Sequence, residues 1–305
     1  EILREHIVEL ASQFKSLDAA IFTTYQFSQS FFESNVLPSV LGIEERGKTA
    51  SRKINYQLAR TELCVFYDSS AFSLLQQPGG GRFRYQAVGI STIGKVFHPK
   101  IVLLAGDLEK DGLPCIFITV CSANLTRAGW GENCEVFSTL NISSKENSNY
   151  KEIEKMIDWL NLTSRKGSSN KKSIIAIQRC RDIMANMPLR NPRSREAISN
   201  GSFYFSPLHS DGFMPFLQAG QTAPWDELIA FSPYWSDVET NIKNANARKN
   251  QLVPALMNNG YFGIAKDEIP NNDEIELMKI KKKIETRFWH AKLYFLRRGN
   301  RLQSA

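Results

Sequence analysis

Two polar residues, His98 and Lys100, interrupt the apolar run VFHPKIVLLA that begins at Val96. Because side chains alternate between the two faces of a strand, the histidine and the lysine are expected to project from one face. A second apolar run, CIFITVCSAN, places Ser122 and Asn124 on a common face in the same way. If the two runs pair as a hairpin, the imidazole, the ammonium and the carboxamide converge. Such a group offers a nucleophile or proton carrier and fixed donors for phosphoryl oxygens, which phosphodiester chemistry requires.

A carboxylate, Glu135, follows Asn124 in the run CEVFSTLNI, where it is expected to bind the second imidazole nitrogen and fix its tautomer. An isolated H-x-K is common by chance and then marks only a polar pair on a half-exposed strand. This chain, however, carries a second copy in RFWHAKLYFL, where His290 follows His98 by 192 residues and Lys292 shares its face. The repetition favours a catalytic role for the two histidine–lysine pairs over a chance occurrence of polar residues on a strand.

Two further matches support an internal duplication. The run AIFTTYQ at residues 20–26 matches IAFSPYW, which begins 209 residues later. The end of the sequence, Gln303-Ser304-Ala305, is expected to mirror Cys121-Ser122-Ala123, so that a second asparagine would come next, beyond Ala305. Short apolar runs separated by helical and polar stretches predict alternating strands and helices in each half, hence an α/β fold. At the start of the sequence, Leu3, Ile7, Leu10 and Phe14 follow one another at steps of four, three and four, which predicts an amphipathic helix.

Paired H-x-K segments followed by S-x-N and a glutamate resemble the phospholipase D superfamily, whose pattern is H-x-K-x4-D with a later G-S-x-N. The spacing from Asn124 to Glu135 is similar to that of the nuclease members. Three positions depart from the pattern: Ala105 and Arg297 replace the family aspartates, and Cys121 replaces the glycine. Because the tyrosyl-DNA phosphodiesterase branch also lacks that aspartate, the resemblance points to this nuclease or tyrosyl-DNA phosphodiesterase-like branch.

The resemblance implies two pseudo-symmetric phospholipase D-like lobes, each a mixed β-sheet flanked by helices. It also implies that one of the two histidines attacks phosphorus to form a phosphohistidine, while the other protonates the leaving oxygen. We expect His98 to be the nucleophile, His290 to be the acid, and Lys100, Lys292 and Asn124 to bind the phosphoryl oxygens. Ser122 and Glu135 complete the predicted catalytic set, and no cofactor is implied.

Composition narrows the function classes. The 305 residues are 42% hydrophobic, which is enough for one large domain or for two lobes with cores of their own. The net charge of +7 suits a polyanionic partner, although it is also common among proteins that bind none. No apolar run is long enough to span a membrane, and no Walker or H-E-x-x-H signature is present. Five cysteines without C-x2-C spacing argue against a zinc site and a disulfide framework, and favour a cytoplasmic location: Cys64, Cys115, Cys121, Cys134 and Cys180.

Weaker signals concern substrate binding. Tyr25 and Tyr234 follow matching strands and are expected either to pack or to stack on bases. A helical run before the second H-x-K ends in basic residues, which either complement the helix dipole or guide a polyanion: Lys281, Lys282, Lys283 and Arg287.

The expected organisation is a first lobe at residues 1–165, a basic connection at 166–201, and a second, C-terminally incomplete lobe at 202–305. The predicted function is a metal-independent phosphodiesterase, a nuclease acting on DNA, and the nuclease part of a restriction or anti-phage system. The resemblance also suggests a fused or associated helicase or restriction subunit. The alternatives are a lipid phosphodiesterase or phosphatidyl transferase, and a catalytically degenerate nucleic-acid-binding module. The expected partner is nucleic acid and not a membrane, while the oligomeric state is left open.

Overall fold

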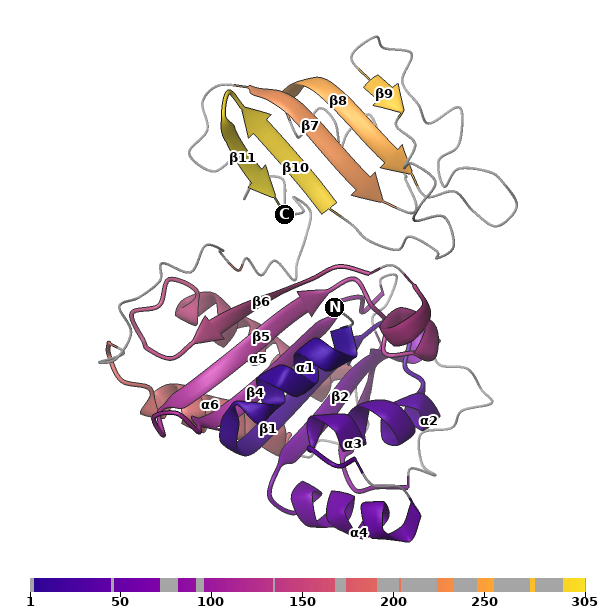
Figure 1. Ribbon diagram of the computed structural model, residues 1–305, viewed down its shortest axis with the longest axis vertical. Coiled ribbons are helices and arrows are strands. Elements are labelled where there is room, and N and C mark those ends of the chain that lie inside the picture. The colour runs from indigo at the N-terminus through magenta and orange to yellow at the C-terminus, as the bar shows by residue number, and fades with distance from the viewer. Residues whose placement is uncertain are drawn as a thin grey trace. The chain divides into compact units, whose positions relative to one another are not determined.

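The computed structural model describes residues 3–44, 47–71, 82–91, 96–133, 135–167, 174–190, 203, 224–232, 246–254, 275–277 and 293–304. The chain divides into two compact units (Figure 1). Unit 1 comprises Glu1–Gly131 and Phe137–Phe205, and unit 2 comprises Glu132–Val136 and Ser206–Ala305.

Unit 1 is built on a six-stranded mixed sheet. In spatial order its strands are β3 (Gln86–Ile90), β2 (Glu62–Asp68), β1 (Phe14–Thr24), β4 (Ile101–Leu108), β5 (Pro114–Cys121) and β6 (Phe137–Ile142). The first three are parallel, and β1 pairs antiparallel with β4. β4, β5 and β6 continue as an antiparallel meander, so the hairpin predicted from the two apolar runs is confirmed.

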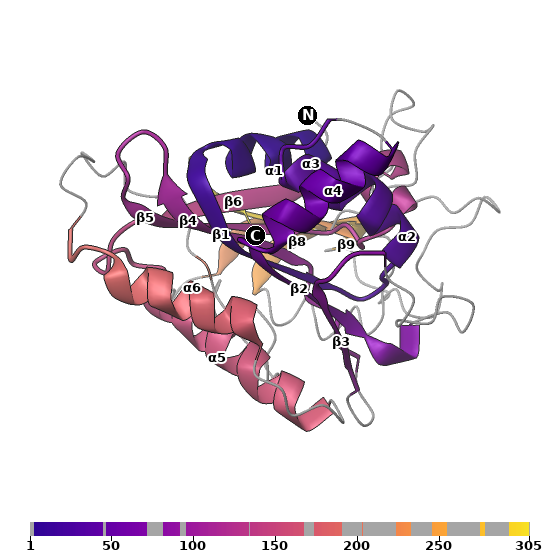
Figure 2. The same ribbon diagram turned by 90° about the horizontal axis from the view of Figure 1, so that it is seen from below.

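Helices cover both faces of this sheet (Figure 2). One face carries α1 (Leu3–Ser12), α2 (Gln29–Phe31), α3 (Leu37–Val40) and α4 (Gly47–Leu58), with a π-helix at Phe32–Val36 between α2 and α3. The other face carries α5 (Tyr150–Gly167) and α6 (Ile175–Asn186). The first helix was predicted from apolar residues at steps of four and three, and α1 does bury Leu3, Ile7 and Leu10.

The stretch at residues 166–201, expected to connect the lobes, contributes to the core of unit 1. In α6, Ile177 and Cys180 are fully buried against the sheet. Tyr150 of α5 donates a hydrogen bond to the Met184 carbonyl, 3.2 Å away. The two basic residues of α6, Arg179 and Arg181, lie on the outer face of this amphipathic helix, and the Arg181 guanidinium is 2.6 Å from the Asp158 carboxylate.

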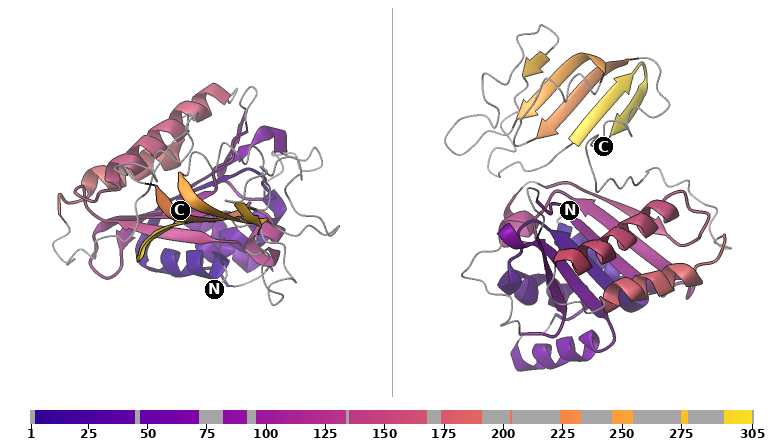
Figure 3. Two further views of the ribbon diagram at one scale, coloured as in Figure 1. Left: turned by 90° about the horizontal axis from the view of Figure 1, so that it is seen from above. Right: turned by 180° about the vertical axis from the view of Figure 1, so that it is seen from behind.

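Unit 2 contains a five-stranded sheet (Figure 3), and its strand order repeats that of five strands of unit 1. Its strands are β11 (Arg301–Ser304), β10 (Leu293–Arg298), β7 (Trp225–Ser232), β8 (Ala247–Pro254) and β9 (Ile275–Leu277). β7, β8 and β9 are parallel, and β10 is antiparallel to both β7 and β11. β7 to β11 therefore correspond to β1, β2, β3, β4 and β5, and the α/β fold with two mixed sheets is confirmed.

One detail of the predicted duplication is wrong. Phe295 corresponds to Leu103 by the spacing of the H-x-K copies, and its partner across the hairpin is Ser304. The partner of Leu103 is Ile118. Ser304 therefore occupies the position of Ile118 in the sheet, and it does not mirror Ser122.

The difference comes from the length of the hairpin connection. Eight residues separate the paired Gly106 and Cys115, whereas two separate the corresponding pair Arg298 and Arg301. The second hairpin is shorter by six residues, and this shortening was not visible in the sequence. Gly299 makes the tight turn possible with a φ of 53°.

Candidate active site

The predicted site residues of unit 1 gather at the edge of the sheet where β1 and β2 end and β4 begins. The sequence predicted His98 and Lys100 on a strand, but they lie in an irregular segment just before β4, which begins at Ile101. His98 is exposed, whereas Lys100 is 6% exposed, and its Nζ lies 3.2 Å from His98 Nδ1 and 3.1 Å from Nε2. The Lys100 ammonium therefore lies close to both ring nitrogens of His98, and which of them can accept a hydrogen bond depends on the tautomer of the imidazole. The arrangement places a buried hydrogen-bond donor beside an exposed imidazole.

An aromatic ring covers the imidazole. Tyr25, the residue after β1, lies against His98 with the ring centroids 5.1 Å apart and the planes inclined by 45°. This contact restricts how the His98 ring can turn. Tyr25, which the sequence suggested as a base-stacking residue, thus contacts the predicted nucleophile.

The Ser122–Asn124 loop is bound to the same segment of the chain. The Asn124 Oδ1 accepts a hydrogen bond from the backbone N–H of Gln26, 3.2 Å away. The amide NH2 of Asn124 is the group that can then donate to a substrate oxygen. Tyr25 contacts His98, and its neighbour Gln26 binds Asn124. The H-x-K segment and the Ser122–Asn124 loop therefore meet at two adjacent residues of the chain.

Two features hold this loop in place. Thr24, fully buried at the end of β1, accepts a hydrogen bond from the Leu125 N–H at 2.9 Å. Gly129 packs directly on the loop backbone, so a Cβ at this position would lie 2.3 Å from the Asn124 carbonyl oxygen. Ser122 follows β5 and is half-buried.

Glu135 belongs to the short segment Glu132–Val136 that groups with unit 2. Its Oε1 accepts a hydrogen bond from Asn133 Nδ2, 3.1 Å away. The predicted contact between Glu135 and His98 therefore remains a prediction.

The second copy of the motif is not described. His290 and Lys292 lie outside the described residues, and so do the weaker substrate-binding candidates Tyr234, Lys281–Lys283 and Arg287. Lys292 is followed directly by β10, as Lys100 is followed by β4.

The phospholipase D pattern has an aspartate at the positions of Ala105 and Arg297, and the surroundings of both residues explain why this chain has none there. Ala105 is fully buried in β4 between Ala19 and Ile116, which are also fully buried. It lies seven residues beyond His98, which corresponds to roughly 20 Å of extended chain. Arg297 in β10 forms an ion pair of 2.9 Å with its cross-strand neighbour Glu227. Ala105 therefore supplies no polar group to the H-x-K segment of unit 1, and the Arg297 guanidinium is engaged across the sheet by Glu227.

Two residues that contact the H-x-K segment were missed in the sequence. The Asp68 carboxylate binds the N–H of Phe97, and the Thr23 hydroxyl binds the N–H of Ile101. Their only sequence signal is a polar residue at or near the end of a buried strand, in IFTTY and in VFYDS. That signal alone does not say which backbone group is bound.

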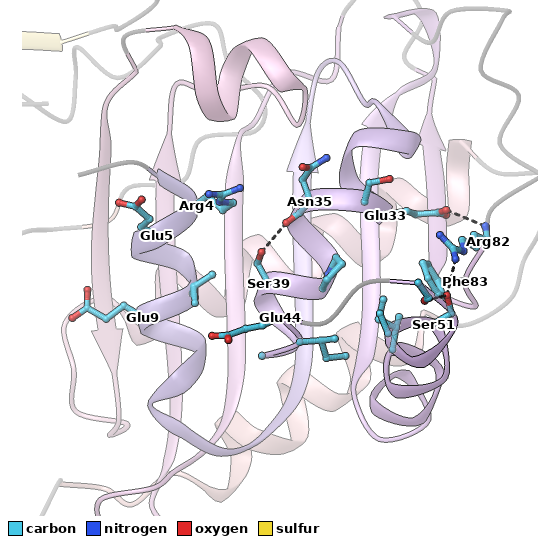
Figure 4. Close-up of a pocket in the computed structure, with 18 residues that line it drawn as sticks. Arg4, Glu5, Glu9, Glu33, Asn35, Ser39, Glu44, Ser51, Arg82 and Phe83 are labelled. Carbon is cyan, nitrogen blue, oxygen red and sulfur yellow. Dashed lines mark hydrogen bonds between the residues drawn. The ribbon is translucent and has the colours of Figure 1, made fainter.

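A separate cavity of about 670 Å³ lies on the α1, α3 and α4 face (Figure 4). Glu33 is central to one side of it, where it accepts hydrogen bonds from Gln29, from the backbone of Arg82 and from the Tyr85 hydroxyl. Burial, followed by the nearby Glu33 charge, raises the pKa of Tyr85. These bonds tie the chain before β3 to the helix layer. Neither His98 nor Asn124 lines this cavity.

Among the residues that the structure describes, no group of three or more potential metal-ligating side chains occurs. No helix in those same ranges is long and apolar enough to cross a bilayer.

Several solved structures have a fold similar to that of this chain. The chain aligns with yeast tyrosyl-DNA phosphodiesterase over 94% of its own length and 75% of that chain, with 11% identity and a TM-score of 0.53. A mutant of the same yeast enzyme aligns over 94% of this chain and 74% of that one, with 9% identity and a TM-score of 0.52. Polyphosphate kinase from Porphyromonas gingivalis aligns over 99% of this chain and 43% of the kinase chain, with 9% identity and a TM-score of 0.48. No protein-family profile and no curated protein matches the sequence.

The likeness to the yeast enzyme confirms the fold that the resemblance to the phospholipase D superfamily implied. The present chain spans less than half the length of the kinase and three quarters of the yeast enzyme. At these identities the likeness concerns architecture, and the reaction has to be argued from the site residues.

Proposed function

We propose that this protein is a metal-independent phosphodiesterase that cleaves DNA through a phosphohistidine intermediate. The observation that carries the proposal is the cluster of His98, Lys100 and Asn124 at one edge of the sheet. An exposed imidazole lies 3.1 and 3.2 Å from a buried ammonium, next to a loop that presents a carboxamide. This combination supplies a nucleophile together with fixed donors for the charge that develops on phosphorus.

In the first half of the reaction, a ring nitrogen of His98 attacks the phosphorus of the scissile diester. A P–N bond forms and the P–O bond to the leaving strand breaks, so that oxygen requires a proton. Lys100 and Asn124 donate to the non-bridging oxygens, whose negative charge increases in the transition state. No metal is needed in this step because the lysine and the carboxamide offset that charge.

In the second half, water attacks the phosphohistidine, the P–N bond breaks, and His98 is regenerated. We assign the proton donor of the first half, and the base that activates water in the second, to His290 of the duplicated motif. Lys292 would serve the same oxygens as Lys100. One group thus acts as acid and then as base, as microscopic reversibility requires.

DNA is the proposed substrate for two reasons. The net charge of +7 favours a polyanion, and the yeast enzyme with the same fold is by name a tyrosyl-DNA phosphodiesterase. A cytoplasmic role in restriction or phage defence, with a helicase or restriction subunit as partner, remains a prediction from the resemblance.

The decisive experiment traps the covalent intermediate. An internally radiolabelled DNA oligonucleotide is incubated with the protein in excess EDTA, and the mixture is denatured at alkaline pH, where phosphohistidine is stable. We expect cleavage and a labelled protein band, both of which are lost in His98→Ala. His6→Ala is the matched control, because His6 lies in the same unit and binds Thr139 on β6.

Other results would reject the proposal in distinct ways. Cleavage that disappears with EDTA and returns with magnesium would remove the metal-independent mechanism. Release of headgroup from phosphatidylcholine vesicles without any DNA cleavage would favour a lipid phosphodiesterase. DNA binding with no cleavage and no covalent adduct would favour a degenerate binding module.

A further inference from the structure

The segment that carries His98 is held at its start by a buried carboxylate. Asp68 ends β2 and is 2% exposed. Its Oδ2 accepts a hydrogen bond from the Phe97 N–H at 2.5 Å, while its Oδ1 accepts bonds from the backbone N–H and the hydroxyl of Ser70. The backbone N–H of Asp68 also donates to the Tyr25 carbonyl, 3.3 Å away. Asp68 therefore connects the residue before His98 to the residue whose ring covers it.

The end of the same segment is held by a hydroxyl. Thr23 is 5% exposed, and its Oγ1 accepts a hydrogen bond of 2.9 Å from the Ile101 N–H. Ile101 is the residue after Lys100 and the first residue of β4. Between these two anchors stands Pro99, which fixes its own φ and restricts His98 to extended conformations.

The two anchors are built into the fold. Thr23 and Asp68 lie near or at the carboxyl ends of the neighbouring parallel strands β1 and β2. Buried backbone N–H groups need acceptors, and ordinary sheet pairing does not supply one at either position. The two side chains take the place of a neighbouring strand where the regular pairing stops.

We propose that Asp68 and Thr23 are positioning residues for catalysis, which fix the backbone at residues 97–101 so that the His98 imidazole and Lys100 Nζ keep their mutual geometry. This inference rests on the proposed function and adds to it the residues that hold the backbone of the H-x-K segment in place. An error of about 1 Å in such an arrangement can lower a rate on the order of 100-fold.

The test uses a matched set of threonine variants in the full chain. Thr23→Val keeps the shape but leaves the Ile101 N–H without its acceptor, and Thr23→Ser keeps the acceptor. Thr61→Val is the control, because the Thr61 hydroxyl is also buried and bonds a backbone carbonyl, that of Leu17, at the opposite end of the sheet. Thermal unfolding of all variants is measured beside kcat and KM on DNA.

We expect Thr23→Val to lower kcat by about 10-fold to 100-fold with KM changed less than about threefold. Thr23→Ser should restore kcat to within about threefold of the unmodified protein. Thr61→Val should lose comparable thermal stability while keeping kcat. A loss of kcat that follows thermal stability equally in Thr23→Val and Thr61→Val would overturn the positioning role.

Asp68→Asn provides a second, independent measurement. The amide has one acceptor oxygen in place of two, so it cannot serve both Ser70 and Phe97. We expect slower formation of the labelled phosphoenzyme and faster hydrogen exchange of the Phe97 amide. Unchanged formation rates in both Asp68→Asn and Thr23→Val, while His98→Ala forms no adduct, would refute the positioning role and leave the proposed function intact. Full activity in His98→Ala would instead refute the proposed function.

Discussion

Restoring the family aspartate by Ala105→Asp should destabilise the protein and should not improve catalysis. Ala105 is fully buried, and its cross-strand neighbours Ala19 and Ile116 are fully buried as well. A carboxylate at this position would face apolar side chains covered by α5 and α6. It would also lie seven residues along the chain from His98, too far to orient the imidazole.

The magnitude follows from the cost of ionising a buried carboxyl group. Full burial raises such a pKa by roughly three units or more, and each unit corresponds to about 1.4 kcal/mol, so the cost at pH 7 is about 4 kcal/mol. A typical domain has a free energy of unfolding of about 5 to 15 kcal/mol, so this loss is a large fraction. Ala105→Asn is the matched control, because it buries a polar side chain of similar size that does not ionise.

The pH dependence has a definite sign. Below about pH 4 the carboxyl is protonated in both the folded and unfolded states, so the two variants should have similar stability. As the pH rises above that value, the unfolded state ionises first, and the stability of Ala105→Asp falls by about 1.4 kcal/mol per unit until the folded-state pKa is passed.

The measurement is hydrogen exchange of the β4 amides in increasing urea, at pH 4 and at pH 7, for both variants. This readout reports on unit 1 even if the two units unfold separately. Equal stability of the two variants at pH 7, or a higher kcat in Ala105→Asp, would refute the reasoning.

Three further predictions concern the site and the core. Gly129→Ala would place a Cβ 2.3 Å from the Asn124 carbonyl oxygen, so we expect a loss of about 1 to 3 kcal/mol and a fall in kcat, checked by urea unfolding and DNA cleavage. His98→Ala should abolish cleavage of every substrate, because no phosphohistidine can form. His290→Ala should be far less impaired on a nitrophenyl phosphodiester than on DNA, because the nitrophenolate leaving group needs no proton. The reverse pattern would exchange the roles of the two histidines. Burial raises the pKa of Cys115 to about 12, so the unfolded state loses the thiol proton at a lower pH than the folded state does. The free energy of unfolding should therefore fall as the pH rises from 9 to 12. Urea titrations of Cys115→Ala should show a smaller fall over the same pH range.

The parts of the fold that could be predicted are those with a local pattern. The steps of four and three among Leu3, Ile7 and Leu10 predicted α1 correctly. The period-two apolar runs around His98 and before Asn124 predicted β4, β5 and their pairing. The duplication was visible because each half repeats a strand pattern that the core requires.

The parts that could not be predicted depend on contacts between distant residues. Asp68 binds a backbone group 29 residues away, and a carboxyl at the end of a strand has many possible partners. The charged residues around α6 gave it the composition of a connecting segment, although Ile177 and Cys180 lie inside the core. The position of Ser304 in the second hairpin depended on a shorter turn, which spacing along one strand does not reveal.

The site residues show the same division. His98, Lys100 and Asn124 were recognisable because their residue types carry chemistry. Thr23 and Asp68 were not, because a hydroxyl or carboxyl that binds the main chain has no distinctive sequence pattern.

The difference in hairpin length also has a practical consequence for labelling this protein. The turn between β4 and β5 lies at the far end of both strands from His98, and the corresponding turn in unit 2 is shorter by six residues without any change in strand order. This turn is closed by hydrogen bonds from Leu108 N–H to the Leu113 carbonyl and from Gly112 N–H to the Leu108 carbonyl, and the Glu109 N–H donates to the Gln13 carbonyl, 2.8 Å away. Glu109 at its start is exposed. A fluorophore, an affinity tag or a small inserted domain placed at Lys110 or Asp111 should therefore report on the protein while leaving the proposed phosphodiester chemistry undisturbed.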